Sequence, residues 1–347
     1  MTLLTLGTRG SKLALAQTHL VAAALQQAHP DLSIHIEVIS TKGDRILDVA
    51  LSKIGDKGLF VTEIEQALRD GRIDLAIHCA KDLPSQLMDG LILGAIPQRA
   101  DARDMLVVAQ PRGSDRKPKM KAVALLDPRG LVRHEARIGS SSLRRASQLL
   151  ALRPDLHMGE MRGNIDTRLR KLAEGQHDAI VLAAAGLQRL GLITLDEANT
   201  AQTFISDDAA FIALPLAVEV MLPAAAQGAL GIECRAGDGR TRALLQPLND
   251  PTTQACVTAE RAFLRALEGG CQVPIAAYAT ANKDALHLRG LVASLDGAAM
   301  VRGEREGDVA TAEQLGHALA QQLLADGATA ILASLKPNST THSISNL

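Results

Sequence analysis

Residues 7–32 read GTRGSKLALAQTHLVAAALQQAHPDL, and this stretch decides the fold because its pattern returns at residues 139–156 as GSSSLRRASQLLALRPDL. Each copy begins with a turn of glycine, serine and basic residues, continues as apolar residues at helical spacing, and closes on Pro-Asp-Leu. The spacing predicts two helices, which end before His29 and before Arg153. Such self-similarity indicates two related structural units in one chain.

The repeat continues beyond the two helices. Residues 34–40 alternate as a strand and lead into the turn 41–44, and the second copy reaches a comparable turn at 162–164. In each copy a later helix then feeds an apolar strand, at 75–78 and at 179–183. Because strands and helices alternate throughout, the sequence predicts an α/β protein with parallel sheets covered by helices.

Length and composition limit the possible functions. The chain has 347 residues, of which 47% are hydrophobic, enough for two or three domains. A net charge of -1 and an aromatic share of 1% argue against a surface that binds nucleic acid or anionic membranes. The four cysteines lack metal-ligand spacing, and no apolar run resembles a signal peptide or a membrane span. We therefore expect a cytoplasmic protein with reduced thiols and no metal.

One thiol is distinguished by its surroundings. Cys271 lies in the run LEGGCQVPI, residues 267–275. Glycine permits positive φ and the close approach of another molecule, and proline ends regular structure, so this turn would present the sulfur for covalent chemistry. The alternative is that Cys271 is a small core residue.

Basic and hydroxyl side chains gather where the predicted helices begin. Free amide groups and the helix dipole attract anions at such positions, and a guanidinium group matches a carboxylate bidentately. The candidates for binding a polyanion are Arg9, Ser11, Lys12, Ser140, Ser142, Arg144, Arg145, Arg162, Arg168 and Arg189. Any single arginine could instead be a solvated surface residue. The pair Arg144 and Arg145 opposes the dipole of its helix, so we expect it to cost stability unless a bound anion neutralises it.

A carboxylate lies between these basic segments. Asp82 follows the apolar strand in the run Lys81-Asp82-Leu83-Pro84, where the chain leaves its sheet. Nearby cations would keep it ionised, so that it could stabilise a developing positive charge on a substrate or move a proton. The alternative is a simple turn pair between Lys81 and Asp82.

These segments resemble the porphobilinogen deaminase family, also called the hydroxymethylbilane synthases. The resemblance is nearly full length, and several spaced motifs in one order make it specific. The motifs are GTRGSKLAL (7–15), GDKGLF (55–60), KDLP (81–84), GSSSLRR (139–145), RGN (162–164), AGLQRLG (185–191), QGALGIECR (227–235) and EGGCQVPI (268–275).

The resemblance implies three domains in an α/β fold. Two similar lobes would resemble type II periplasmic binding proteins, and a smaller α/β C-terminal domain would carry the cofactor cysteine. The expected boundaries are residues 1–98 plus 228–247 for the first lobe, 102–226 for the second, and 250–347 for the C-terminal domain. The family expectation for the oligomeric state is a monomer.

The resemblance also implies a reaction. Four porphobilinogen molecules would condense head to tail with loss of ammonia, on a dipyrromethane primer bound to Cys271 through a thioether, before 1-hydroxymethylbilane is released for tetrapyrrole biosynthesis. Asp82 would be catalytic, facing the pyrrole nitrogens and stabilising cationic intermediates. Cofactor-binding residues would be Cys271, Lys81, Ser140, Ser142, Arg144, Arg145, Gly163, Asn164 and Gln227. Substrate-binding residues would be Arg9, Ser11, Phe60, Arg162, Arg168 and Arg189, with no metal.

The chain departs from the family pattern at a few positions. Cys79 replaces a usual serine and could weaken a contact to substrate carboxylates, and Ala226 replaces a usual glycine. Segments 111–137 and 192–220 look longer than in the common form, without suggesting a new activity. Phe60 could stack on a pyrrole or belong to a helix core.

Two other functions remain as alternatives. A two-lobed solute-binding protein would bind anions without turnover, but it would leave Cys271 and the third domain without a role. A nucleic-acid-binding regulator would need a basic surface and stacking aromatics, which the composition does not supply.

Overall fold

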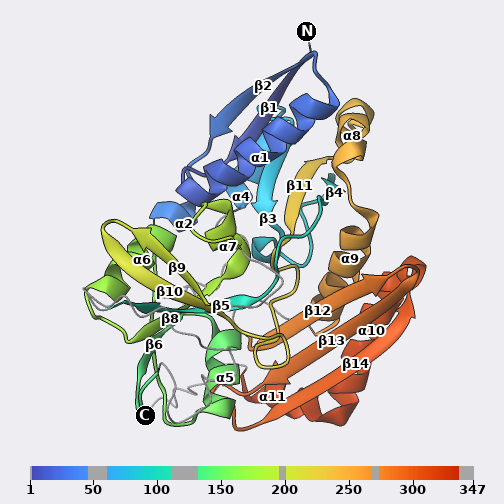
Figure 1. The fold of residues 1–347 in the computed structure, drawn as a ribbon. Helices are drawn as coiled ribbons and strands as arrows, with labels where there is room; N and C mark the ends of the chain where they lie inside the picture. Colours follow the sequence, from blue (N-terminus) through green and yellow to red (C-terminus); the bar gives the residue numbers. More distant parts are fainter. Residues whose placement is uncertain (1, 46–60, 111–131, 195–200, 268–272, 336–347) are drawn as a thin grey trace, which may run out of the picture.

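The computed structural model describes all residues except 1, 46–60, 111–131, 195–200, 268–272 and 336–347. The described strands form sheets of five, six and three strands. In Figure 1 the five-stranded sheet lies at the top, the six-stranded sheet at the lower left and the three-stranded sheet at the lower right. Each sheet carries its own helices, so each forms a separate layered unit.

The five-stranded sheet comes from both early and late parts of the chain. Its strands in spatial order are β2 (Leu32–Val38), β1 (Thr2–Thr8), β3 (Leu75–Cys79), β11 (Leu230–Arg235) and β4 (Leu91–Ala95). Strand β11 is antiparallel to both of its neighbours, and β1 is parallel to β2 and β3. The helices of this unit are α1 (Lys12–Ala28), α2 (Lys42–Arg45), α4 (Thr62–Arg69) and α8 (Gly239–Leu245).

The six-stranded sheet is built from the middle of the chain. Its strands in spatial order are β7 (His157–Gly159), β6 (Arg137–Gly139), β8 (Ala179–Ala183), β5 (Asp104–Ala109), β10 (Ala209–Pro215) and β9 (Gln202–Ser206). Strand β5 is antiparallel to both β8 and β10. The helices of this unit are α5 (Leu143–Leu152), α6 (Ile165–Ala173) and α7 (Ala184–Arg189).

The two larger sheets share one topology, which confirms the internal repeat. Strands β2-β1-β3 correspond to β7-β6-β8, the antiparallel strand β11 corresponds to β5, and β4 corresponds to β10. The expectation of parallel sheets is wrong in part, because each of the two larger sheets contains an inserted antiparallel strand, β11 or β5, and the edge strand β9 is antiparallel to β10. Each insertion comes from a segment that crosses between the units, so its direction depends on the path of the whole chain and not on a local pattern.

The repeated helices begin for the same local reason. Ser11 Oγ accepts a hydrogen bond from Ala14 N at 3.2 Å, and Ser142 Oγ accepts one from Arg145 N at 3.4 Å. A serine at this position satisfies a backbone donor that the first helical turn leaves free. Both helices end where the sequence predicts. The predicted turn at 41–44, in contrast, is the short helix α2.

The third unit packs a helical layer on one antiparallel sheet. Strands β12 (Ile275–Asn282), β13 (Ala285–Ala293) and β14 (Met300–Asp308) lie against α9 (Pro251–Ala266), α10 (Ala312–Leu323) and α11 (Thr329–Ser334). Phe263 of α9 fills the centre, where a Cβ on Gly290 would come within 2.6 Å of its ring. The glycine therefore permits the close contact between helix and sheet.

The α/β fold class and the presence of two similar lobes with a smaller third unit are thus confirmed. None of the helices in the described parts of the chain is both long and apolar enough to cross a membrane.

Candidate active site

The predicted catalytic carboxylate lies at the carboxyl end of β3. Lys81 and Asp82 form a short 3-10 turn, Ala80–Asp82, directly after this strand. Asp82 is exposed and, within the described residues, has no hydrogen bond or ion pair. Lys81 instead donates a hydrogen bond from Nζ to Gln227 Oε1 at 3.1 Å. The two neighbours therefore do not form the turn pair that was the alternative reading, and Asp82 keeps its oxygens available.

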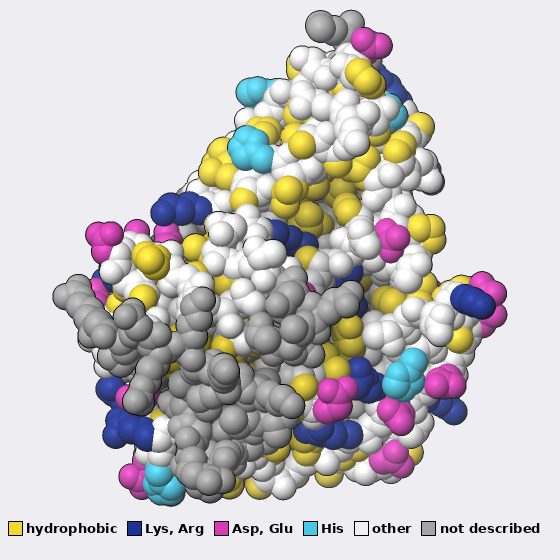
Figure 2. Space-filling model, viewed as in Figure 1, with side chains coloured by type: hydrophobic (Ala, Val, Ile, Leu, Met, Phe, Trp, Pro, Cys, Tyr) yellow, Lys and Arg dark blue, Asp and Glu magenta, His cyan; other side chains and the backbone are white. Residues whose placement is uncertain are grey.

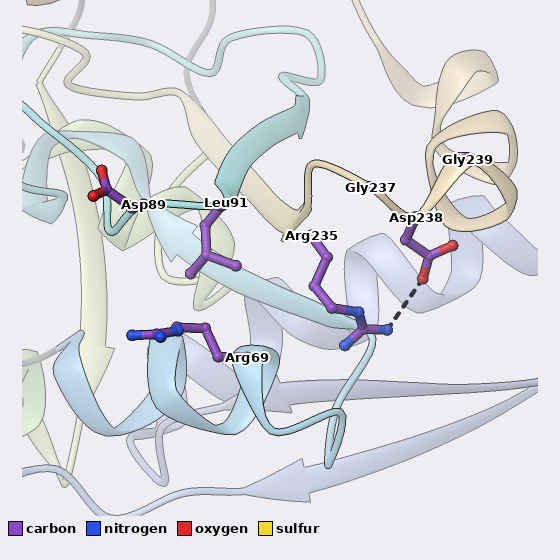
Figure 3. A pocket seen from close by; sticks show the side chains of 8 residues that line it. Arg69, Asp89, Leu91, Arg235, Gly237, Asp238 and Gly239 are labelled. Carbon is purple, nitrogen blue, oxygen red and sulfur yellow. Dashed lines mark hydrogen bonds and ion pairs between the residues drawn. The ribbon is translucent and has the colours of Figure 1, made fainter.

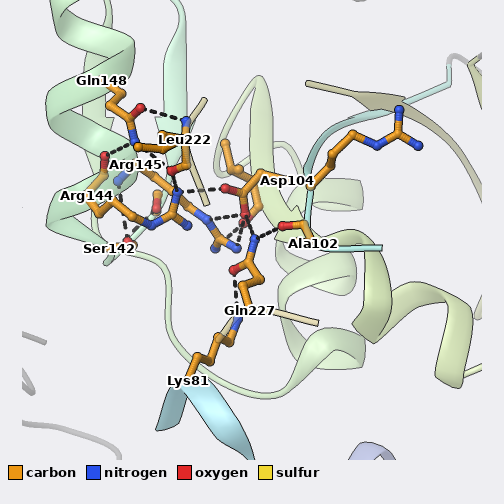
Figure 4. Close-up of polar contacts among 12 residues, drawn as sticks. Lys81, Ala102, Asp104, Ser142, Arg144, Arg145, Gln148, Leu222 and Gln227 are labelled. Atoms are coloured by element: carbon orange, nitrogen blue, oxygen red, sulfur yellow. Dashed lines mark hydrogen bonds and ion pairs between the residues drawn. The ribbon is translucent and has the colours of Figure 1, made fainter. Parts of the chain in front are cut away.

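The arginine pair at the start of α5 has an internal partner. Arg144 Nη1 donates to Asp104 Oδ2 at 2.8 Å, and Arg145 donates to Asp104 Oδ1 from Nε at 2.9 Å and from Nη2 at 2.6 Å. Figure 4 shows Asp104 between the two guanidinium groups and Gln227. The expectation that a bound anion is the only source of neutralisation for this pair is wrong, because Asp104 supplies one internal negative charge against the two arginines. Sequence analysis missed Asp104, although a charged residue opening the apolar run Asp104–Ala109 was a possible signal.

Burial makes this cluster rigid. Asp104 is 0% exposed, and Arg144 and Arg145 are 5% and 6% exposed. The two arginines also donate to the carbonyl oxygens of Leu222 and Val181. Burial acts to raise the pKa of Asp104, but the charges of Arg144 and Arg145 outweigh it and hold that pKa well below its ordinary value. The carboxylate is therefore ionised across the physiological range.

Two other predicted arginines have no carboxylate partner among the described residues. Arg168 Nε donates to Gly163 O at 2.8 Å, and Arg189 Nη2 donates to Gly228 O at 2.6 Å. Burial and the charge of Arg145 lower the pKa of Arg168 to about 10, while the charge of Asp82 acts in the opposite direction. Burial also lowers the pKa of Arg189. Both groups are cations whose charge an anionic ligand would stabilise.

The remaining predicted side chains differ in their burial and in their hydrogen-bond partners. Arg9 is partly buried, and Arg162 pairs with Glu160, Nε to Oε1, at 2.8 Å. Ser11 and Ser142 serve as helix caps, as described above, so their hydroxyls already have a structural role.

The other polar candidates lie on the turns that lead into α5 and α6. Ser140 Oγ accepts a hydrogen bond from Ser142 N at 3.2 Å. Gly163 has φ of 105°, which favours glycine, and Asn164 is exposed at the start of α6 without a capping hydrogen bond. Phe60 and Cys271 lie outside the described residues, so their predicted roles stay predictions.

The two departures from the family pattern have definite environments. Cys79 Sγ accepts a hydrogen bond from Gln17 Nε2 at 3.1 Å, and burial raises the pKa of its thiol, so the side chain is neutral. Ala226 adopts φ of 61°, in the left-handed region that glycine occupies without strain. The backbone shape that a glycine would favour is thus present despite the extra methyl group.

The third unit is anchored to the crossing segments by a buried ion pair that sequence analysis also missed. Arg99 donates to Glu260 from Nη1 to Oε1 at 2.6 Å and from Nη2 to Oε2 at 3.1 Å. Glu260, on α9, also accepts hydrogen bonds from Ala226 N and Ala279 N. This contact ties α9 to the crossing between the lobes.

Two pockets lie in the described parts of the chain, and only the second reaches a predicted site residue, Arg189. One, of about 630 Å³, is lined by Arg69, Leu91, Arg235 and Asp238, and Figure 3 shows Arg235 turned toward Asp238. Strand β11 is antiparallel to β3, so Arg235 marks the opposite end of the sheet from Asp82. A second pocket, of about 810 Å³, lies between α1, Pro97–Ala100 and Arg189. On the face in Figure 2 basic and acidic side chains are mixed, with no continuous basic patch. No group of three or more metal-ligating side chains occurs in the described ranges.

Comparisons with known proteins agree with one another. The family model "Porphobilinogen deaminase, dipyromethane cofactor binding domain" matches residues 4–243, and "Porphobilinogen deaminase, C-terminal domain" matches residues 254–325. Porphobilinogen deaminase from Roseiflexus castenholzii is 52% identical over 330 residues, covering 95% of this chain and 98% of that protein. The porphobilinogen deaminase of Syntrophotalea carbinolica is 51% identical over 332 residues, covering 96% of each chain. That of Listeria monocytogenes is 44% identical over 330 residues, covering 95% of this chain and 97% of that protein.

The family models match most of the chain, and the relatives match it nearly from end to end at about half identity. By these matches and by its fold, the chain belongs to the porphobilinogen deaminase family.

Proposed function

We propose that the cluster at the ends of β3, α5, α6 and α7 is the active site for the family reaction. In that reaction four porphobilinogen molecules condense head to tail with loss of ammonia, and 1-hydroxymethylbilane is released. The observation that carries the assignment is Asp82, an exposed carboxylate whose charge acts on Lys81 of its own lobe and on Arg168 of α6. A free carboxylate facing cations from two lobes is suited to a substrate with carboxylate groups and a developing positive charge.

The described residues fit a dipyrromethane group. Its two pyrroles carry four carboxylates, and the cluster offers Lys81, Arg145, Arg168 and Arg189 against the single buried carboxylate of Asp104. Arg168 and Arg189 spend only one donor each on backbone carbonyls, which leaves most of each guanidinium fork for bidentate contacts. Attached through Cys271, the group would supply the nucleophilic pyrrole carbon to which each new unit is joined.

The residues of the chain would divide the work as follows. Asp82 would accept hydrogen bonds from pyrrole N–H groups and stabilise the cation that porphobilinogen forms when ammonia leaves. Lys81 and Arg145 would hold carboxylates of the primer, assisted by Ser140, Ser142, Arg144, Gly163, Asn164 and Gln227. Arg9, Ser11, Phe60, Arg162, Arg168 and Arg189 would bind the incoming substrate and the growing chain.

Arg144 is assigned the smallest direct part in this division. Its Nη1 donates both to Asp104 and to Leu222 O, and the side chain is 6% exposed. Its charge therefore supports the site mainly by holding Asp104.

We also propose the domain boundaries expected from the sequence, namely 1–98 plus 228–247, 102–226 and 250–347. Sheet membership supports them, because β1 to β4 and β11 share one sheet while β5 to β10 share the other. Helix α9 begins at Pro251, just after the third boundary. We further propose a cytoplasmic monomer that binds no nucleic acid. Sedimentation of the purified protein, with and without DNA, would test this proposal.

The intact mass of the purified protein tests the proposed function directly. Wild type should carry an adduct the size of two linked pyrrole units, and a Cys271→Ser variant should lack it. If wild type is unmodified and also fails to acquire the adduct from porphobilinogen, the catalytic proposal fails, and a two-lobed anion-binding protein without turnover becomes the better explanation.

A further inference from the structure

The Asp104 cluster connects three parts of the chain that are distant in sequence. Asp104 begins β5, Gln227 lies in the segment between β10 and β11, and Lys81 follows β3. Gln227 Nε2 donates to Asp104 Oδ1 at 3.0 Å, and Gln227 Oε1 accepts from Lys81 Nζ at 3.1 Å. Figure 4 shows the three side chains in a row, with Gln227 in the middle. A continuous path of hydrogen bonds therefore runs from the buried carboxylate of one lobe to the ammonium group of the other.

The Gln227 amide can take only one orientation in this path. Gln227 Nε2 also donates to Ala102 O at 2.7 Å, so two acceptors face one end of the amide. Asp104 is ionised and a backbone carbonyl has no proton, so neither can donate. The NH₂ group must face them, and the carbonyl oxygen Oε1 must then face Lys81. Gln227 is 0% exposed, which leaves water little opportunity to replace either contact.

Lys81 depends on this acceptor because burial disfavours its charge. Burial lowers the pKa of Lys81, and the charge of Arg145 adds to that effect, whereas the negative charges of Asp82 and Asp104 act against it. The hydrogen bond from Lys81 Nζ to the oriented Gln227 Oε1 satisfies one donor of this ammonium group and so favours its charged form.

We propose that Asp104 is a positioning residue that, through the amide of Gln227, holds the Lys81 ammonium group beside Asp82. In doing so it sets where the carboxylates of the pyrrole chain are bound relative to the catalytic carboxylate. The role of Lys81 toward pyrroles rests on the proposed function, whereas the path from Asp104 to Lys81 does not.

This role differs from simple neutralisation of the arginine pair. Arg144 and Arg145 together bring two positive charges to Asp104, so the carboxylate is already saturated in charge without Gln227. The extra hydrogen bond to Gln227 is not needed for neutralisation. It transmits the position of the buried carboxylate to a lysine on the other lobe.

The titration of Lys81 provides a readout that a purely structural role would not move. Acetic anhydride would be used across a pH series to acetylate four proteins: wild type, Asp104→Asn, Gln227→Met and the double variant. The acetylated fraction of Lys81 would be quantified by peptide mass. Exposed Lys283 serves as the internal standard. The pH dependence of the rate is compared, and not the rate itself, because accessibility scales the rate equally at every pH. Circular dichroism confirms that each variant is folded.

The proposed path from Asp104 through Gln227 to Lys81 predicts a specific pattern of shifts. The pH of half-maximal labelling of Lys81 should fall in Gln227→Met and in Asp104→Asn, because each loses part of what stabilises the ammonium form. Asp104→Asn should have a smaller effect in the Gln227→Met background, because the path is already cut. A matched control is Asp155→Asn, which breaks the pair with Arg153 (2.6 Å) beyond the other end of α5 and should leave Lys81 unchanged.

Two results would overturn the proposal. One is a folded Gln227→Met variant with an unchanged Lys81 titration, and this test remains decisive even if Asp104→Asn does not fold. The other is full additivity of the two substitutions.

Primer occupancy, measured by intact mass, separates this proposal from the proposed function. Reduced occupancy in Gln227→Met with a shifted Lys81 titration supports both. If neither wild type nor the variants ever carry a primer, but the Lys81 titration of the variants is shifted relative to wild type, the path is supported and the proposed function is rejected.

Discussion

The arginines of α5 and those of α6 and α7 look alike in the sequence but differ in the structure. Arg144 and Arg145 are almost fully buried and share the carboxylate of Asp104. Among the described residues, Arg168 donates to the carbonyl of Gly163 and Arg189 to that of Gly228, and neither has a carboxylate partner. The first pair shares one internal carboxylate, which offsets one of its two positive charges, whereas the second pair has no carboxylate partner among the described residues. The difference teaches that a place near a helix start does not decide whether an arginine already has an internal carboxylate partner.

The largest expected effect comes from breaking the first pair. Arg144→Met should lower the free energy of unfolding by on the order of 3–5 kcal/mol, because Asp104 loses one of its two buried arginine partners. Urea denaturation measures this loss. The control Arg265→Met breaks the more exposed pair with Glu313 and should cost about 0–1 kcal/mol. Equal losses in the two variants would show that the Asp104 cluster is no stronger than a surface ion pair.

Acid should also destabilise the Asp104 cluster, with a smaller loss of folding stability than Arg144→Met causes. The pKa of Asp104 is lowered in the folded state from the ordinary value of 3.8, so its ionisation stabilises the fold above that pH and the contribution is lost as the pH falls through the folded value. Wild type should therefore lose stability below about pH 4 more steeply than Asp104→Asn. Thermal midpoints at a series of acidic pH values provide the measurement, and parallel curves would argue against the assignment.

The second pair should behave in the opposite way. Arg168→Met should leave the unfolding free energy unchanged or slightly higher, because it removes a partly buried cation without a carboxylate. Substrate binding should weaken by about 1.5–3 kcal/mol, or roughly 10- to 100-fold, when one charge-assisted contact is lost. Steady-state kinetics with porphobilinogen gives this value. Arg170→Met, on the same helix but exposed and paired with Glu174, should preserve activity. A large loss of stability in Arg168→Met would place Arg168 with the first pair.

The smallest expected effect concerns Ala226, in the segment that crosses between the two lobes. Ala226 has φ of 61°, and a left-handed alanine costs about 1–2 kcal/mol. Ala226→Gly should relieve that strain and, after the extra entropy of glycine, raise stability by less than about 1 kcal/mol. The neighbouring Ala225→Gly, where φ is not positive, should lower stability instead. Thermal unfolding distinguishes the two signs.

Local sequence patterns were sufficient for much of the fold. The serine turns predicted the starts of α1 and α5, and the apolar runs predicted β3 and β8, because capping and strand periodicity depend on neighbours within a few residues. The inserted antiparallel strands β5 and β11 were not predicted. Their direction follows from the path of the chain between the lobes, which no short window contains.

The candidate site divides in the same way. Sequence analysis predicted Lys81, Asp82 and Arg189 within the spaced motifs and Arg168 among the basic residues near helix starts, and their roles stay predictions. The sequence did not reveal that Asp104 pairs with Arg144 and Arg145, because these residues are separated by about forty positions in the chain. Ser11 and Ser142 were predicted to bind ligands, and the structure shows that their hydroxyls cap helices.

The sequence by itself therefore determined the repeat, the helix starts, the family and the residue types of the cleft, since each depends on local order or on spaced motifs. Only the tertiary structure decided which cations have an internal carboxylate partner among the described residues and which do not. The physical reason is that a buried charge depends on the groups within a few ångströms, and folding brings those groups together from distant parts of the chain.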